Sequence, residues 1–230
     1  MLDIGCNVEQ KGGYDITALH EASSRGHPDL VQLLSRKGAH VNIQDNWSFM
    51  TPLQHAASGG HAEVIRVLLS NEASMESQGA PRNELSALHI AAASGFEAAM
   101  LAMLEHGANT ESVSGLLKST PMQKAARWGH ERIVWLLISR GANAMAKDMS
   151  LTTVHCTAQG GNTAVVKLLL DEGADVTVED DHGRTSMHCA IRHNQPAVER
   201  ILHVAGSALA PTMARRRGAL GSGLDQLLRS

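Results

Sequence analysis

One short sequence pattern recurs six times along this chain of 230 residues, and the recurrence limits the folds that the chain can adopt. Its clearest copy reads Thr51-Pro52-Leu53-Gln54-His55-Ala56-Ala57, and successive copies start 34, 35, 34, 32 and 33 residues apart. A unit of this length cannot bury its apolar side chains alone, so neighbouring copies must stack on one another. The period therefore predicts an elongated array instead of a domain with one central core.

The clearest copy carries the signals of a short helix at both ends. Thr51 has a hydroxyl that can cap free backbone N–H groups, and Pro52 suits the first turn because it has no N–H to leave unpaired. Leu53 and the two alanines that follow at helical spacing form one narrow apolar face. Gly60 can adopt the left-handed conformation that ends a helix. We therefore expect a short helix that packs closely against its neighbours.

A second helix is predicted after the first in every copy, at constant spacing. The distance from the starting Thr or Ser to the end of this helix is 21 residues in all six copies, while the connector to the next start varies from 11 to 14 residues. Packed helices tolerate no change of register, whereas exposed loops tolerate insertions. The pattern predicts rigid helix pairs joined by variable loops, which we call fingers.

The period and the Thr-Pro-Leu-His-x-Ala pattern resemble the ankyrin repeat family over residues 1–206. The resemblance implies a mainly α fold, a solenoid of helix-turn-helix layers with projecting β-hairpin-like loops. A partial repeat at 1–16 would precede full repeats starting near 17, 51, 86, 120, 152 and 185, and residues 207–230 are expected to form a poorly ordered tail. Gln54 and Gln123 replace the histidine of the pattern, and only two copies keep its proline.

Three local departures from the pattern carry expectations of their own. Glu72 stands where the other copies end their second helix with glycine, and we expect it to cost some stability there. Asn194 replaces a glycine between two helices, and asparagine accepts the left-handed conformation. The finger from Ala146 to Leu151 is the shortest and lacks a turn glycine, which predicts a distorted hairpin.

The composition argues against several classes of protein. A net charge of -3 provides no overall attraction for nucleic acid, and no stretch approaches the roughly 20 apolar residues of a membrane span. The first residues contain no apolar run of the kind found in a secretory signal. The three cysteines, Cys6, Cys156 and Cys189, are expected to be free thiols. These features favour a cytoplasmic or nuclear protein.

The thirteen histidines are mostly explained by their places in the repeat. Seven of them recur either in the fourth position of the pattern or after the glycine between the helices, where we expect hydrogen bonds between layers: His20, His89, His155, His188, His27, His61 and His130. No nucleophile motif, phosphate-binding loop or pair of catalytic carboxylates is visible. We therefore predict no enzyme activity, no metal, no cofactor and no small-molecule substrate.

The predicted function is a non-catalytic scaffold that binds another protein or a peptide. An alternative is that the chain is the regulatory or targeting ankyrin segment of a larger enzyme or receptor, because the sequence opens in the middle of a repeat. A purely structural spacer is a third possibility, and it predicts that surface mutations affect no partner.

The predicted binding site is a groove formed by the first helices and the fingers, centred on Trp128. Tryptophan and arginine are the residue types most enriched among interface hot spots, and Arg127 precedes Trp128. A partner would place an apolar residue beside Trp128 and an acidic group near Arg127. The further predicted contacts are Ser94, Gln159 and Arg25 on the first helices and Met50 and Leu85 at the bases of fingers.

A second surface is suggested by the outward positions of the second helices. Leu101 and Trp135 are large and apolar there, in neighbouring copies, whereas the other four copies have polar or charged residues. An exposed pair would indicate a contact with a partner or another domain. The alternative is that Trp135 packs onto its own helix.

Overall fold

The structure is a computed structural model, and it describes residues 7–76 and 85–207. The part of the N-terminal partial repeat before Asn7, Cys6, most of the loop before Leu85 and the predicted tail after Ser207 lie outside the described residues. The expectations for these segments stay predictions.

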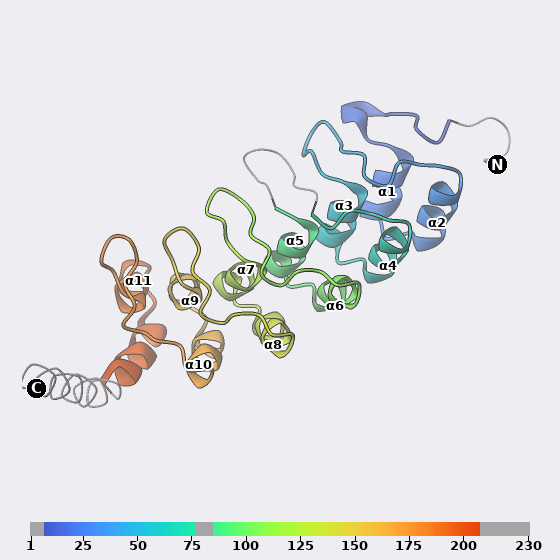
Figure 1. Cartoon of the computed structure of the whole chain (residues 1–230). Helices are drawn as coiled ribbons and strands as arrows, with labels where there is room; N and C mark the ends of the chain where they lie inside the picture. Colours follow the sequence, from blue (N-terminus) through green and yellow to red (C-terminus); the bar gives the residue numbers. More distant parts are fainter. Residues whose placement is uncertain (1–6, 77–84, 208–230) are drawn as a thin grey trace, which may run out of the picture.

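The helices form two parallel rows (Figure 1). The first helices of successive layers are α1 (Ala18–Ser24), α3 (Pro52–Gly59), α5 (Ala87–Ser94), α7 (Pro121–Trp128), α9 (Thr153–Gly160) and α11 (Ser186–Arg192). The second helices are α2 (Pro28–Arg36), α4 (Ala62–Ser70), α6 (Glu97–Glu105), α8 (Glu131–Ser139) and α10 (Thr163–Asp171), followed by a helical segment at 196–207. A short 3₁₀ helix, η1 (Gly13–Asp15), lies in the first finger. The predicted α-solenoid is confirmed.

The first helices begin as the repeat predicts. Thr51 and the side chain of Gln54 form a capping box, in which each side chain bonds the backbone N–H of the other residue. Thr17, Thr120, Thr152 and Thr185 form the same box with the residue three positions later. Because glutamine accepts the N–H of the capping threonine as histidine does, the exchange of histidine for Gln54 preserves the start of the helix.

The fourth residue of the pattern also ties each layer to the next. The imidazole Nε2 of His89 bonds the carbonyl oxygen of Ser119 at 2.9 Å, and that of His155 bonds the carbonyl of Arg184 at 2.9 Å. Gln54 donates its amide N–H to the carbonyl of Leu85 at 2.7 Å. These bonds confirm the predicted hydrogen bonds between layers for His89 and His155, whereas His188 Nδ1 bonds Thr185 in its own layer. The bond of Gln54 shows why glutamine is an adequate substitute.

The core runs along the whole array between the two rows of helices. The alanine pairs of α3, α5 and α7 are fully buried, which lets adjacent first helices approach closely. Leu68, Met103, Leu137 and Leu169 fill the same place in successive second helices and are also fully buried. Each layer therefore depends for its burial on the layers beside it.

The helix ends keep their left-handed backbone even where glycine is replaced. Glu72 has a φ of 64° and Asn194 a φ of 53°. Gly107, which occupies the position of Glu72 in the next repeat, has a φ of 83°. The stacking of the layers fixes this conformation, so the replaced residues adopt it at a cost in strain. The predicted left-handed turn at Asn194 is confirmed.

The fingers contain no β-sheet among the described residues. Two isolated antiparallel bridges occur, Ser114 with Ser119 and Lys147 with Thr152. The second spans the finger that we predicted to be a distorted hairpin, and one isolated bridge does not test that prediction. The carboxylate of Asp148 accepts the N–H groups of Ser150 and Leu151, at 2.9 and 2.7 Å, and so closes the turn without glycine.

Two further expectations concern cysteines and membranes. Cys156 and Cys189 are buried and free, as predicted. Burial raises the pKa of Cys156 to about 12, so its thiol stays protonated at neutral pH. None of the described helices has the length and apolar character needed to cross a membrane.

Candidate functional site

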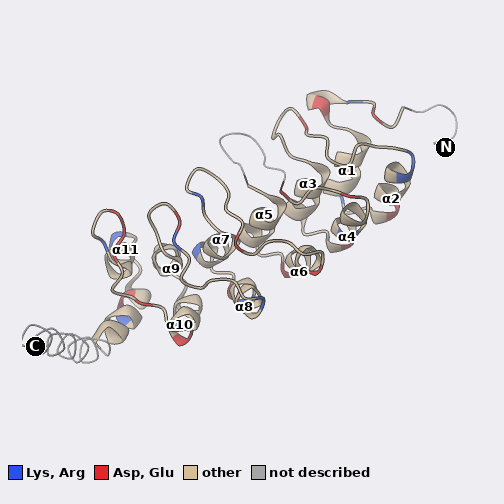
Figure 2. Ribbon diagram, viewed as in Figure 1, with Lys and Arg blue, Asp and Glu red and all other residues tan. Residues whose placement is uncertain are grey.

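Charge is unevenly divided between the two rows of helices (Figure 2). From α3 to α11 the first helices contain no Asp or Glu, but they carry three cations, Lys124, Arg127 and Arg192. The second helices from α2 to α10 carry six acidic and four basic residues. The net charge of -3 therefore hides a positive surface on the first helices.

Trp128 is the last residue of α7 and lies within this positive surface. Its side chain is 66% exposed. Lys124, Arg127 and Trp128 are spaced i, i+3 and i+4 on one helix, so they occupy adjoining positions. The predicted centre of the site is thus an exposed indole with two cations beside it.

The neighbours of Trp128 in the adjacent layers are small. Ser94 at the end of α5 is exposed, and so is Gly160 at the end of α9. A Cβ atom on Gly160 would collide with the carbonyl oxygen of Arg127, whereas one on Gly59 would meet only the side chain of His61. Glycine therefore allows α9 to approach the backbone of α7 closely at the point where Trp128 is presented.

The cations on α7 and α11 form no ion pairs within the described part of the chain. Neither Lys124 nor Arg127 nor Arg192 forms an ion pair there. Burial lowers the pKa of Lys124, and the positive charge of Arg127 lowers it further, against smaller opposing effects from Cys156 and Asp148. The negative charge of an incoming carboxylate would offset both the repulsion from Arg127 and the desolvation of Lys124.

The other predicted contacts are placed differently. Ser94 and Gln159 flank α7 in the adjacent layers, with Ser94 exposed and Gln159 half-buried. Met50 and Leu85 are half-buried finger bases, and Arg25, at the end of α1 in a distant layer, is exposed and paired with Glu21. The structure therefore gathers Arg127, Trp128, Ser94 and Gln159, but Arg25 and Met50 belong to the other end of the array.

The surface of the second helices also has an exposed tryptophan. Trp135 is 61% exposed, so it does not pack away onto its own helix, while Leu101 is half-buried. A hollow of about 380 Å³ beside it is lined by Glu97, Glu131, Arg132, Trp135 and Leu168. Its charges are mixed, since Arg132 pairs with Glu97 at 3.6 Å.

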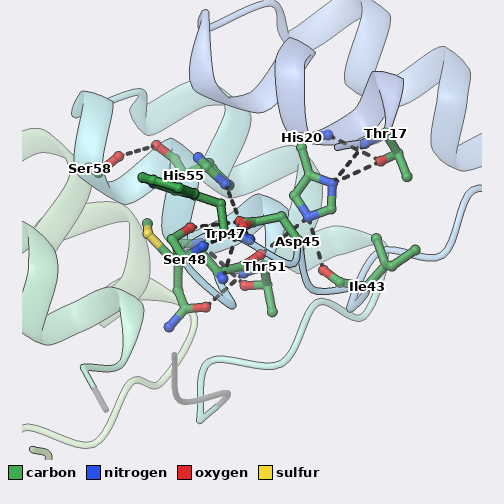
Figure 3. Close-up of polar contacts among 11 residues, drawn as sticks. Thr17, His20, Ile43, Asp45, Trp47, Ser48, Thr51, His55 and Ser58 are labelled. Atoms are coloured by element: carbon green, nitrogen blue, oxygen red, sulfur yellow. Dashed lines mark hydrogen bonds and ion pairs between the residues drawn. The ribbon is translucent and has the colours of Figure 1, made fainter. Parts of the chain in front are cut away.

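One polar cluster was not foreseen from the sequence. Asp45 in the second finger is buried, and it accepts hydrogen bonds from the backbone N–H of Trp47 at 2.8 Å and of Ser48 at 2.6 Å (Figure 3). The Ser48 hydroxyl at 2.7 Å and His55 Nε2 at 2.9 Å also bond to its carboxylate. The spacing of Asp45 ahead of the Thr51 cap was the only signal available.

The same cluster brings three potential metal ligands together. Nitrogen or oxygen atoms of His20, Asp45 and His55, one from each, lie within 4.8 Å of one another. His20 Nδ1 accepts the N–H of Thr17, so its Nε2 carries the proton and bonds the carbonyls of Ile43 and Met50, each at 3.2 Å. Both oxygens of Asp45 are already used. These hydrogen bonds indicate a cluster that stabilises the conformation of the finger rather than one that binds a metal ion.

Asp45 gives the first testable prediction. Burial opposes its charge, but hydrogen bonds from Ser48, His55 and Trp47 outweigh burial and hold its pKa well below the ordinary 3.8. The Asp45 carboxylate therefore makes its full contribution to the free energy of unfolding when the pH is above 3.8, and this contribution falls as the pH drops below 3.8. Asp45→Asn should lower the free energy of unfolding by about 2–3 kcal/mol at pH 7.

Urea unfolding at pH 7 and pH 3.5 measures this effect. The difference between wild type and Asp45→Asn should shrink at the lower pH. Asp181→Asn is the control, because Asp181 is exposed and pairs only on the surface with Lys147, at 3.0 Å. Equal losses in the two variants would show that Asp45 does not lock the finger.

Comparison with known sequences now decides the family. The family profile described as "Ankyrin repeats (3 copies)" matches residues 1–79, 75–148 and 147–208. The chain belongs to the ankyrin repeat family. The match agrees with the repeat spacing, the capped first helices and the bonds between layers.

Several ankyrin repeat proteins resemble this chain. A Caenorhabditis elegans homologue of transient receptor potential cation channel subfamily A member 1 is 31% identical over 80% of this chain but only 15% of its own length. Mouse ankyrin repeat and SOCS box protein 16 is 30% identical over 78% of this chain and 41% of its own length. The crystal structure of the human ASB11 ankyrin repeat domain has a TM-score of 0.78, 26% identity and 89% coverage of both chains.

Proposed function

We propose that this ankyrin repeat chain is a non-catalytic scaffold whose protein partner docks between the first helices and the fingers, centred on Trp128. Ankyrin repeats are in general protein–protein interaction modules. The observation that carries the proposal is the exposed Trp128 beside Lys124 and Arg127, which have no ion pairs within the described chain.

The surface favours a partner segment that is both apolar and acidic. The indole offers a flat apolar contact of the kind that dominates interface energies. The cations would attract carboxylates over distances of about 10 Å at moderate salt and so raise the rate of association. Two free buried thiols are compatible with the reducing conditions of the cytoplasm or nucleus.

Affinity capture with charge-reversed variants tests the proposal. Proteins bound by the wild-type chain should be lost with Arg127→Glu and retained with Arg132→Glu. Both changes reverse one exposed arginine, but Arg132 lies on α8 in the second row of helices. Equal retention by all three chains, or equal loss in both variants, would contradict docking on the first helices.

A second candidate is a regulatory or targeting segment of a larger protein. The observation in its favour is that this chain spans only 15% and 41% of the two relatives described above. Reading the complete transcript tests it, since another domain in the same reading frame would support this function. An open reading frame limited to the repeats would contradict it.

A further inference from the structure

Half of the aromatic residues of the chain lie on the first two fingers. The sequence contains three Trp, one Tyr and two Phe residues. On these fingers Tyr14 is 64% exposed, Trp47 71% and Phe49 42%. The rings of Tyr14 and Trp47 contact each other with centroids 5.0 Å apart and planes tilted by 59°. Their exposed faces form one aromatic platform on neighbouring fingers.

The platform is held in a fixed position by bonds between and within the fingers. The backbone N–H of Asn46 bonds the carbonyl of Tyr14 at 2.9 Å, and its side-chain amide bonds the carboxylate of Asp15 at 2.7 Å. Asp45 closes the turn that carries Trp47 (Figure 3). Tyr14 has a left-handed φ of 59°, which an aromatic residue adopts only with backbone strain.

The exposed charges at the platform, on Lys11 and Asp15, cancel. Lys11 pairs with Asp15 at 3.0 Å, and Asn46 bonds the same carboxylate. A charged ligand would therefore gain little here, in contrast to the surface around Trp128. The shortage of free positive charge also argues against an anionic membrane surface, which basic side chains normally attract.

The unpaired polar groups indicate what the neutral ligand must supply. Within the described residues, neither the phenol of Tyr14 nor the indole N–H of Trp47 makes a hydrogen bond. A proline-containing segment in the polyproline conformation supplies apolar rings for the two aromatic faces and free backbone carbonyls for the two donors. We propose that the Tyr14–Trp47 platform binds such a segment of a partner protein, independently of the proposed site at Trp128.

Titration of the intact chain with a decaproline peptide tests this inference. The three indole N–H groups give separate signals in a two-dimensional ¹H–¹⁵N NMR spectrum, and single Trp→Phe variants assign them. The signal of Trp47 should shift to saturation while those of Trp128 and Trp135 stay in place. A Gly-Ser decapeptide should cause no shift. Tyr14→Ala should weaken decaproline binding at least tenfold, whereas Trp135→Ala should not change it.

If decaproline shifts none of the indole signals, or shifts only Trp128, the assignment of the platform is wrong. Broadening of the Trp47 signal by phosphatidylserine vesicles without any response to decaproline would overturn it in favour of a membrane contact. An unchanged thermal midpoint in Tyr14→Ala would show that its loss of binding does not come from unfolding. The result at Trp47 is independent of whether Trp128 binds a partner.

Discussion

Replacing Leu68 by alanine should lower the free energy of unfolding by about 2–5 kcal/mol. Leu68 lies in α4, and its side chain is fully buried. The change removes apolar contacts and leaves a cavity that its neighbours fill only in part. Because α4 lies in an interior layer, the cavity weakens contacts on both sides of it.

Arg66→Ala is the control in the same helix. Its guanidinium reaches Glu63 at 2.5 Å and Glu105 at 3.5 Å on the surface, and exposed ion pairs of this kind contribute at most about 1 kcal/mol. Urea unfolding followed by circular dichroism measures both variants. Comparable losses would show that the burial of α4 is not what stabilises this layer.

The shape of the unfolding curve provides a second measure. Stability in a repeat array is approximately a sum of the stabilities of the layers and of the contacts between them. A weakened interior layer should let the two ends of the array unfold separately, which broadens the transition and lowers its dependence on urea. A sharp transition in Leu68→Ala would indicate that the array still unfolds as one unit.

The sequence was informative wherever the repeat itself determines the structure. The capping role of Thr51 and the bonds made by His89 and His155 follow from their places in the pattern. Asn194 also has the predicted left-handed backbone, because stacking of the layers imposes the same turn on each copy. A residue at a repeated position has the same backbone conformation and neighbours as its equivalents, even when its identity departs from the family pattern.

The fingers could not be predicted in the same way, because their lengths differ and no register carries over. The contact of Tyr14 with Trp47 joins two loops that share no sequence pattern. Asp45 and Asp148 each close a turn with their carboxylates. Neither turn contains a glycine from which the sequence could have predicted it. The sequence identified the finger bases as contacts, whereas the exposed rings of Tyr14 and Trp47 lie at the tips.

The site at Trp128 was predictable in position but not in its electrostatics. Its exposure follows from small residues in the adjacent layers, Ser94 and Gly160, which the sequence shows. The positive charge of the first helices depends on Arg192 in α11 joining Lys124 and Arg127 in α7, while most acidic residues of the helices lie in the second row. That segregation requires knowledge of which row each helix occupies.

Trp128→Ala should weaken binding of the partner by about 2–4 kcal/mol, a loss of roughly 30- to 1000-fold in affinity. A side chain that is 66% exposed contributes little to folding, so the free energy of unfolding should change by no more than about 0.5 kcal/mol. The effect on binding is large because the indole combines a wide apolar face with a rigid position at the end of α7. Isothermal titration calorimetry with the purified partner measures the affinity, and urea unfolding measures the stability.

Trp135→Ala is the matched control for this prediction. Trp135 is 61% exposed, close to the value for Trp128, but it lies on α8 in the second row of helices. The two variants lose the same side chain at similar exposure, so they differ only in the surface from which it is removed. Binding through the first helices requires loss of affinity in Trp128→Ala and wild-type affinity in Trp135→Ala. The opposite result would place the partner on the second helices, beside the hollow between Glu97 and Leu168.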